Sequence, residues 1–397
     1  MLNLSKRADL MPASPIRKLV PFAQEAKKRG VKVYHLNIGQ PDIKTPELFF
    51  QAIKNFDAPV LEYALSQGNL DLIDSFRKYY KKWNIDFAQD EIIITNGGSE
   101  AIIMSMMAIG DPGDEVLVPE PFYANYNGFA CEAGMEVKPI TTKAEEGFHL
   151  PSKAYIKSLI KPNTRAIMIS NPGNPTGAVY TKEELVMLGE IALEHDIFLI
   201  GDEVYREFIY DGLKFTSLMD IAGIEDRVII CDSISKRYSA CGARIGCVCS
   251  KNKNFMKTIM KFAQARLCAP TIEMIGATAL VDTAKEYFAE VNLEYQKRRN
   301  IVYDALKNIP GVVCEKPMGA FYVVAKLPID NAEDFAKWML TDFNVNNATT
   351  MVAPAEGFYA TPGLGKDEVR LAYILKEEDL KVAMDILAKG IEAYNKR

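Results

Sequence analysis

The segment Arg227–Cys249 brings an amine, hydroxyl groups and a guanidinium into one short loop. Its sequence, RVIICDSISKRYSACGARIGCVC, predicts a strand, a polar loop with Ser233, Lys236 and Arg244, and a second strand. Because desolvation and a neighbouring cation favour a neutral amine, a lysine held in such a loop can attack a carbonyl group. An arginine keeps its charge and suits a phosphate or a carboxylate. This set of groups fits a phosphorylated aldehyde, and the alternative is a solvated loop with two surface cations.

Other side chains that could do chemistry also follow apolar segments with the character of strands. Four such positions lie earlier in the chain: Gly97-Gly98, Tyr123, Asn174 and Asp202. In a sheet of parallel strands, ligands bind beyond the carboxyl ends of the strands. Together with Lys236, these positions therefore predict one shared site at that edge.

Each of these positions has a chemical interpretation and a structural alternative. The glycine pair precedes an expected helix, where backbone N–H groups and the helix dipole attract an anion, but such pairs also form plain turns. Asn174 lies between a glycine and a proline, which fix the direction of its amide. Asp202, with Tyr205 three residues further on, is a carboxylate at the edge of a core, or else a helix cap. Tyr123 can lie flat against a ring or pack in the core.

The pattern of the expected elements changes along the chain. Strands alternate with helices between about residues 90 and 250, which predicts an α/β layer with a mainly parallel sheet. From Val312 onwards, short alternating segments and a helix at 331–341 predict a smaller α+β part. There Arg370 has apolar neighbours on both sides, in EVRLAYIL (368–375). A strand arginine in this position either exposes one face of the strand or meets an anion.

Composition narrows the class of protein. The chain has 397 residues, of which 48% are hydrophobic and 25% charged, as in ordinary globular proteins with room for one large and one smaller domain. A net charge of −5 gives no general reason to bind nucleic acid or an anionic membrane. No apolar stretch reaches the length of a bilayer span and the N-terminus lacks the core of a signal peptide, so we expect a cytoplasmic protein. The seven cysteines do not have the spacing of a zinc site, and no metal is expected.

In their order and spacing, these residues resemble the class I pyridoxal-phosphate-dependent aminotransferases, the aspartate-aminotransferase-like enzymes of fold type I. The resemblance covers nearly the whole chain. The residues that carry it are Asn37 and Gly39, Tyr63, Gly97-Gly98-Ser99, Tyr123, the loop Asn171-Pro172-x-Asn174-Pro175-Thr176-Gly177, Asp202-x-x-Tyr205, Ser233-x-x-Lys236, Gly242-x-Arg244-x-Gly246 and Arg370. The asparagine–proline loop and the serine–lysine segment are each fairly specific.

The resemblance implies a fold and an assembly. It implies a large cofactor-binding domain at 46–285, with a mixed, mostly parallel sheet flanked by helices. A smaller α+β domain would be built from both chain ends, 1–45 and 286–397. It also implies a homodimer whose active sites lie at the subunit interface.

The resemblance further implies how pyridoxal 5′-phosphate would be held. Lys236 would form the covalent link to the cofactor and then shuttle a proton. Asp202 would pair with the protonated pyridine nitrogen, which keeps the ring a good electron sink. Tyr205 and Asn174 would hold the phenolic oxygen of the ring, and Tyr123 would stack on it.

Phosphate and substrate would be bound by a second set of residues. The resemblance assigns the phosphate to Gly98, Ser99, Ser233 and Arg244, joined by Tyr63 of the partner subunit. The α-carboxylate of the amino acid would be held by Arg370 in a bidentate grip, together with Asn174 and the backbone near Gly39.

One departure from the family pattern concerns the choice of substrate. In an aspartate-specific branch, a lysine that binds the distal carboxylate directly follows the glycine pair, whereas this chain has Ser99 and then Glu100. The other branch uses an arginine of the partner subunit, for which Arg266 is a loose match. The amino donor is therefore left open, and with it any residue for a distal carboxylate.

Three functions are compatible with these observations. The first is transamination between an α-amino acid and a 2-oxo acid. The second is a carbon–sulfur β-lyase on the same scaffold, since the cofactor residues would be identical. The third is a non-enzymatic regulator that senses a ligand, but such proteins carry an N-terminal DNA-binding domain. Gly39 lies near the start of this acidic chain, which disfavours the regulator.

Overall fold

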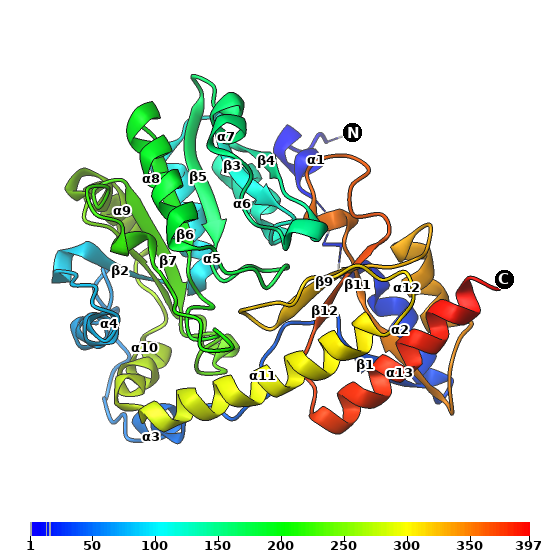
Figure 1. Cartoon of the computed structure of the whole chain (residues 1–397). Helices are drawn as coiled ribbons and strands as arrows, with labels where there is room; N and C mark the ends of the chain where they lie inside the picture. Colours follow the sequence, from blue (N-terminus) through cyan, green and yellow to red (C-terminus); the bar gives the residue numbers. More distant parts are fainter. Residues whose placement is uncertain (1, 13, 16) are drawn as a thin grey trace.

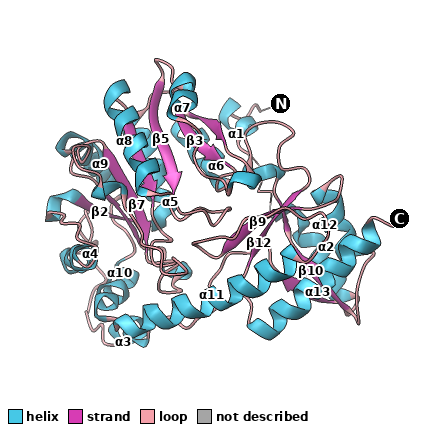
Figure 2. Ribbon diagram, viewed as in Figure 1, coloured by secondary structure: helices cyan, strands magenta, loops and turns pink. Residues whose placement is uncertain are grey.

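The computed structural model describes residues 2–12, 14–15 and 17–397, and it divides into two regions (Figure 1). The larger region is a seven-stranded sheet with helices on both faces (Figure 2). Its strands are β2 Ile92–Thr95, β3 Glu115–Glu120, β4 Glu136–Thr141, β5 Thr164–Ser170, β6 Phe198–Asp202, β7 Val228–Ser233 and β8 Gly246–Cys249.

The seven-stranded sheet has the order β2-β8-β7-β6-β5-β3-β4. The strands β3 to β7 pair in parallel, while β8 is antiparallel to both of its neighbours, β2 and β7. The carboxyl ends of β2, β3, β5, β6 and β7 therefore meet at one edge of the sheet. This arrangement confirms the predicted fold class, a mixed and mostly parallel sheet.

The sheet forms because its strands are apolar on both faces. Along β7, Ile229 packs into one core and Ile230 into the other, as the two-residue period of a strand requires. One face is covered by α5 Gly97–Ile109, α6 Asn125–Ala133 and α9 Lys253–Arg266. The other face is covered by α3 Glu47–Lys54, α4 Leu70–Lys81, α7 Lys153–Leu159, α8 Lys182–His195 and α10 Thr271–Thr278.

The smaller region is built from both ends of the chain. A three-stranded sheet consists of β11 Ala353–Pro354, β12 Glu368–Ala372 and β9 Tyr322–Lys326. A two-stranded sheet pairs β1 Lys32–His35 in parallel with β10 Ala348–Met351. Around them lie α2 Val20–Lys28, α11 Lys285–Lys307, α12 Ala332–Thr341 and α13 Glu377–Tyr394, with the short α1 Lys6–Leu10 beside α6. Long α11 runs from the larger region to the smaller one (Figure 1). The domain limits 1–45, 46–285 and 286–397 stay predictions.

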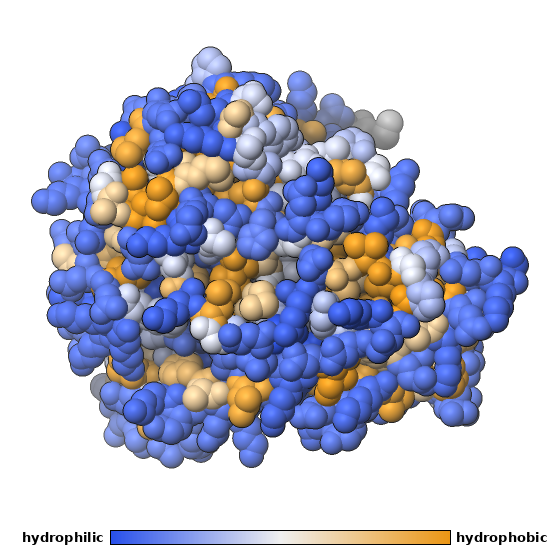
Figure 3. All heavy atoms as spheres, viewed as in Figure 1, coloured by the Kyte–Doolittle hydropathy of each residue, from blue (hydrophilic) through white to orange (hydrophobic). Residues whose placement is uncertain are grey.

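The surface in Figure 3 is largely hydrophilic, with hydrophobic side chains gathered in patches. Among the described residues, two N-terminal segments are rich in large exposed hydrophobic side chains. These are Leu2, Leu4, Leu10 and Met11 in the first segment, and Val60, Leu61, Tyr63 and Leu65 in the second. Such stretches are typical of surfaces that meet another protein.

Candidate active site

The amine of Lys236 lies at the carboxyl edge of the seven-stranded sheet, in the loop after β7. Its Nζ donates to the backbone oxygen of Gly39 at 3.1 Å and lies 3.9 Å from the Sγ of Cys241. Gly39 belongs to the N-terminal end of the chain, so the two regions of the molecule meet at this amine. A Cβ atom built on Gly39 would lie 1.7 Å from the hydroxyl oxygen of Tyr322, so any larger residue would have to displace the Tyr322 ring.

Asp202, the last residue of β6, has one carboxylate oxygen with a partner and one without. Its Oδ2 accepts a hydrogen bond of 2.6 Å from the hydroxyl of Tyr126, whereas its buried Oδ1 has no protein partner. Burial is the largest cause that raises the pKa of Asp202, to about 6, while the Tyr126 hydrogen bond opposes the rise. A buried carboxylate with a free acceptor is suited to a cationic N–H donor, such as a protonated ring nitrogen.

A small cradle lies where α5 begins. Gly97 has a left-handed backbone (φ +76°), and a Cβ atom built on it would lie 2.4 Å from Nη2 of Arg244. A Cβ atom on Gly98 would lie 3.9 Å from that of Ser233. The first N–H groups of a helix have no partner within the helix, and the helix dipole favours anions there. Ser99 follows in the first turn of α5, so this arrangement can bind a phosphate.

Tyr123 lies beside Tyr126, with the ring centres 5.5 Å apart and the rings nearly perpendicular. Burial raises the pKa of Tyr123 to about 12, and the charges of Arg370, Asp202 and Arg244 also act on its hydroxyl. The ring therefore lies among the groups expected to surround a cofactor.

Arg370 is a buried cation with no carboxylate partner. Its side chain is 2% exposed, and within the described residues its hydrogen-bond acceptors are an amide oxygen and a backbone oxygen, with no carboxylate among them. Nη1 donates to Oδ1 of Asn174 at 3.2 Å and Nη2 to the backbone oxygen of Asn37 at 2.7 Å, while Nε has no partner. Burial lowers the pKa of Arg370 from its usual value. A desolvated guanidinium of this kind is a site for an anion, such as a carboxylate.

Tyr205 and Asn174 lie close to this arginine. The hydroxyl groups of Tyr205 and Tyr322 share a hydrogen bond of 2.9 Å, and the ring centre of Tyr322 lies 4.7 Å from the guanidinium carbon of Arg370. Through Tyr322, the residues of the sheet edge and those of the smaller region form one continuous cluster.

Sequence reasoning missed two members of this cluster, Tyr126 and Tyr322. Nothing in the sequence separated Tyr126 from core residues, because it lies in an aromatic segment. Its spacing of three residues from Tyr123, which brings the two rings close together, could have identified it. Tyr322 lies in the middle of an apolar strand and carried no signal.

Two residues considered from the sequence, Tyr63 and Arg266, do not join this cluster. Tyr63 is 81% exposed, and within the described chain no hydrogen bond ties it to the cluster. Arg266 forms an ion pair with Glu100 at 3.2 Å and donates to the backbone oxygens of Ser66 and Ile94. Its charge and its Nη2 are thus engaged within its own chain, while its buried Nε and Nη1 form no hydrogen bond with the described residues.

Comparisons with known proteins define the family. The family model "Aminotransferase class I and II" matches residues 31–387. The aspartate aminotransferase of Bacillus subtilis is 30% identical, over 99% of this chain and 100% of that protein. The aromatic-amino-acid aminotransferase 2 of Thermococcus litoralis is 32% identical, over 98% and 99%.

Solved structures agree with this assignment. A double mutant of the Thermus thermophilus aspartate aminotransferase superposes with a TM-score of 0.89 at 29% identity, covering 98% of this chain and 100% of that one. An alanine aminotransferase from Pyrococcus furiosus gives 0.90 at 31% identity, with the same coverage. The chain belongs to the class I and II aminotransferases and has the fold type I architecture. It is an enzyme that transfers an amino group.

Two searches within the described residues complete the description. No helix in 2–12, 14–15 and 17–397 is long and apolar enough to cross a membrane. In the same part of the chain, no group of three or more metal-ligating side chains comes together.

Proposed function

We propose that the cluster around Lys236 binds pyridoxal 5′-phosphate and exchanges an amino group between an α-amino acid and a 2-oxo acid. Membership of the family implies this cofactor. The observation that carries the proposal is the unpartnered Oδ1 of Asp202, buried in the same cluster as Lys236. A protonated pyridine nitrogen is the donor that this oxygen lacks.

The donors in the cluster fit each part of the cofactor. Gly98, Ser99, Ser233 and Arg244 would hold the phosphate at the start of α5. The aldehyde would meet the amine of Lys236. Tyr205 and Asn174 would hold the phenolic oxygen and Tyr123 would lie against the ring, which are the roles that the family pattern implies.

The chemistry divides between the cofactor and the protein. When bound, pyridoxal phosphate supplies an electron sink for the negative charge that develops at the substrate Cα. Asp202 keeps the ring nitrogen protonated by offering a carboxylate in a buried site. Lys236 holds and moves the proton at its Nζ, close to the backbone oxygen of Gly39. Arg370 orients the substrate through its α-carboxylate, with Asn174 at its side.

A homodimer completes the proposal. The exposed hydrophobic segments 2–11 and 60–65 supply a surface for a second copy of the chain. Tyr63 lies in one of them, where it is free to reach the phosphate site of the partner subunit. The domain limits given above and a cytoplasmic location belong to the same proposal.

The residues near the site also bear on the amino donor. Ser99 stands where an aspartate-specific branch has a lysine, and Arg266 is paired with Glu100. We therefore propose that neither position supplies a dedicated cation for a distal carboxylate, and that the enzyme uses neutral or aromatic donors at least as well as aspartate.

An amino-donor screen with 2-oxoglutarate and pyruvate as acceptors tests the function. Conversion of a donor to its 2-oxo acid, with matching amination of the acceptor, is expected. A preference for aspartate of more than roughly tenfold would contradict the proposed donor class, since tenfold is about 1.4 kcal/mol of discrimination. Release of ammonia and a 2-oxo acid from a cysteine-type donor without any acceptor would instead indicate the β-lyase.

A further inference from the structure

A buried ion pair closes the loop that carries Lys236. Nη1 of Arg237 donates to both carboxylate oxygens of Asp232, at 2.7 and 2.9 Å, and the two side chains are 2% and 0% exposed. Asp232 also accepts the N–H of Ser233 at 2.7 Å and the hydroxyl of Tyr80 at 3.0 Å. The pair joins the residue before Ser233 to the residue after Lys236, so it spans both groups.

Helix α4 packs against this ion pair. The guanidinium carbon of Arg237 lies 4.1 Å from the ring centre of Tyr79 and 5.8 Å from that of Phe76. Phe76, Tyr79 and Tyr80 occupy one face of the helix, as their spacing requires. Arg237 thus packs against α4, while the neighbouring Lys236 reaches Gly39.

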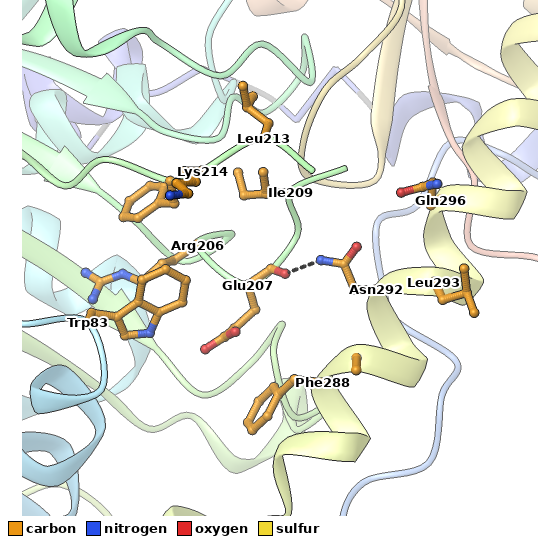
Figure 4. Close-up of a pocket in the computed structure, with 12 residues that line it drawn as sticks. Trp83, Arg206, Glu207, Ile209, Leu213, Lys214, Phe288, Asn292, Leu293 and Gln296 are labelled. Carbon is orange, nitrogen blue, oxygen red and sulfur yellow. Dashed lines mark hydrogen bonds between the residues drawn. The ribbon is translucent and has the colours of Figure 1, made fainter. Parts of the chain in front are cut away.

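The loop after β6 is built in the same way. Glu203, which directly follows Asp202, forms a buried ion pair with Arg206, which directly follows Tyr205. The Arg206 guanidinium lies 4.8 Å from the ring centre of Tyr80 on α4. Figure 4 shows Arg206 beside Trp83, whose ring centre is 5.7 Å away, at a groove of about 620 Å³ next to α11. Helix α4 therefore packs against the arginine of both ion pairs, one in each loop.

Stability alone does not explain a buried ion pair. Replacing such a pair by apolar residues of similar volume is often neutral or stabilising, because desolvation offsets the attraction between the charges. The pair instead contributes geometry, because the directional hydrogen bonds between Asp232 and Arg237 fix the two ends of the loop relative to each other.

We propose that Asp232 and Arg237 are positioning residues that hold the Nζ of Lys236 in place to attack the cofactor aldehyde. This inference rests on the proposed function. The attack joins Nζ to the aldehyde carbon, and one water leaves as the carbon–nitrogen double bond forms, without any change of oxidation state. A misplacement of about 1 Å in a reacting group can cost a factor of about a hundred in rate.

The test compares covalent and non-covalent binding by cofactor-free protein. Pyridoxal phosphate is added, samples are quenched with borohydride at timed intervals, and the labelled lysine is identified by peptide mass. In parallel, the equilibrium affinity for pyridoxamine phosphate is measured, because this compound fills the same site without reacting with an amine. In Arg237→Lys we expect attachment at Lys236 at least about tenfold slower, because a lysine cannot supply the paired donors. The pyridoxamine phosphate affinity should change less than about threefold.

A matched control is available in Arg299→Lys. Arg299 is also fully buried and its Nη2 contacts both oxygens of Asp211, at 2.8 and 2.9 Å, and its hydrogen bonds go to residues outside the Lys236 loop. This variant should attach the cofactor at the wild-type rate. If Arg299→Lys slows cofactor attachment as much as Arg237→Lys does, the inference is overturned, because a general loss of packing would then explain both results.

A second variant keeps the inference testable if Arg237→Lys does not fold. Tyr80→Phe removes only the hydroxyl group that donates a hydrogen bond to Asp232. Cofactor attachment should then slow by a factor of about two to five. A wild-type rate in Tyr80→Phe, or in folded Arg237→Lys, overturns the inference. If wild-type protein is labelled at a lysine other than Lys236, the proposed function itself fails.

Discussion

The two halves of the candidate site are assembled in different ways. At the edge of the seven-stranded sheet, Asp202 ends a buried strand and Lys236 follows one by three residues. In the smaller region, Arg370 meets the backbone of Asn37, which is 333 positions away in the sequence. The first half is thus fixed by local structure, whereas the second half exists only once the chain ends have come together.

The halves also differ in charge. Within the part of the chain that the structure describes, the sheet edge buries a carboxylate whose Oδ1 has no partner, and the smaller region buries the guanidinium of Arg370 without a counter-ion. A buried charge is stable only when it is paired. One half therefore calls for a cation and the other for an anion, which are the ring nitrogen and the α-carboxylate in the proposed function.

The largest effect is expected from Lys236→Ala, which removes the reactive group of the sheet edge. Borohydride should then trap no cofactor on the protein, because the amine that forms the covalent link is gone. The measurement is peptide mass after reduction. A covalent adduct at another lysine would break the assignment of the nucleophile.

Asp202→Asn should separate binding from chemistry within the same half. The variant keeps the cofactor but loses most of its turnover, roughly a hundredfold or more, because a neutral amide cannot hold the ring nitrogen protonated. Cofactor content and kcat report the two effects. Turnover at the wild-type level would reduce Asp202 to a structural cap.

Arg370→Lys should affect only the other half. A lysine keeps the charge but not the paired geometry, so about 2 to 4 kcal/mol of transition-state binding is lost. This loss corresponds to a factor of roughly thirty to a thousand in kcat/KM, and it should be the same for every amino donor.

A control distinguishes this role from others. Cofactor affinity should be unchanged in Arg370→Lys, since the residue lies in the smaller region. A variant that changes only the preference among donors, or that releases the cofactor, would place Arg370 away from the α-carboxylate.

The smallest effect concerns stability and pH in cofactor-free protein. Burial raises the pKa of Asp202 from 3.8 to about 6, so the folded state keeps a proton that the unfolded state has already lost. The stability due to the neutral carboxyl is complete below the unfolded value and is lost as the pH rises through about 6. Relative to wild type, Asp202→Asn should therefore gain about 2 kcal/mol in free energy of unfolding between pH 4.5 and pH 7. If chemical denaturation shows that the free energies of unfolding of the variant and of wild type change with pH in the same way, this expectation is wrong.

Much of the sheet edge could be predicted from the sequence, because strand ends are local signals. The apolar segments before Asp202 and Ser233 defined their strands, and the parallel sheet then brought their carboxyl ends together. For Arg370, the apolar neighbours predicted a strand arginine that is either exposed or facing an anion, and the structure buries it. The roles of these residues stay predictions.

Other parts of the site had no local signal. Tyr126 bonds to Asp202 and Tyr322 to Tyr205 only through tertiary packing, and an aromatic residue in an apolar segment reads as core. The Asp232–Arg237 pair was hidden for another reason. In the sequence, two opposite charges beside a serine and a lysine indicate a solvent-exposed polar loop, and only the structure shows that both side chains are buried.

The pairing of β1 with β10 has a consequence for how the enzyme is made. All seven strands of the large sheet are present once residue 249 has left the ribosome, but residues 32–35 still lack their partner at 348–351. The 333 positions between Asn37 and Arg370 take roughly twenty seconds to a minute to translate at about 5–20 residues per second. During most of this interval the N-terminal strand stays unpaired, and the nascent chain is able to assemble its cofactor edge before it has any place for a substrate.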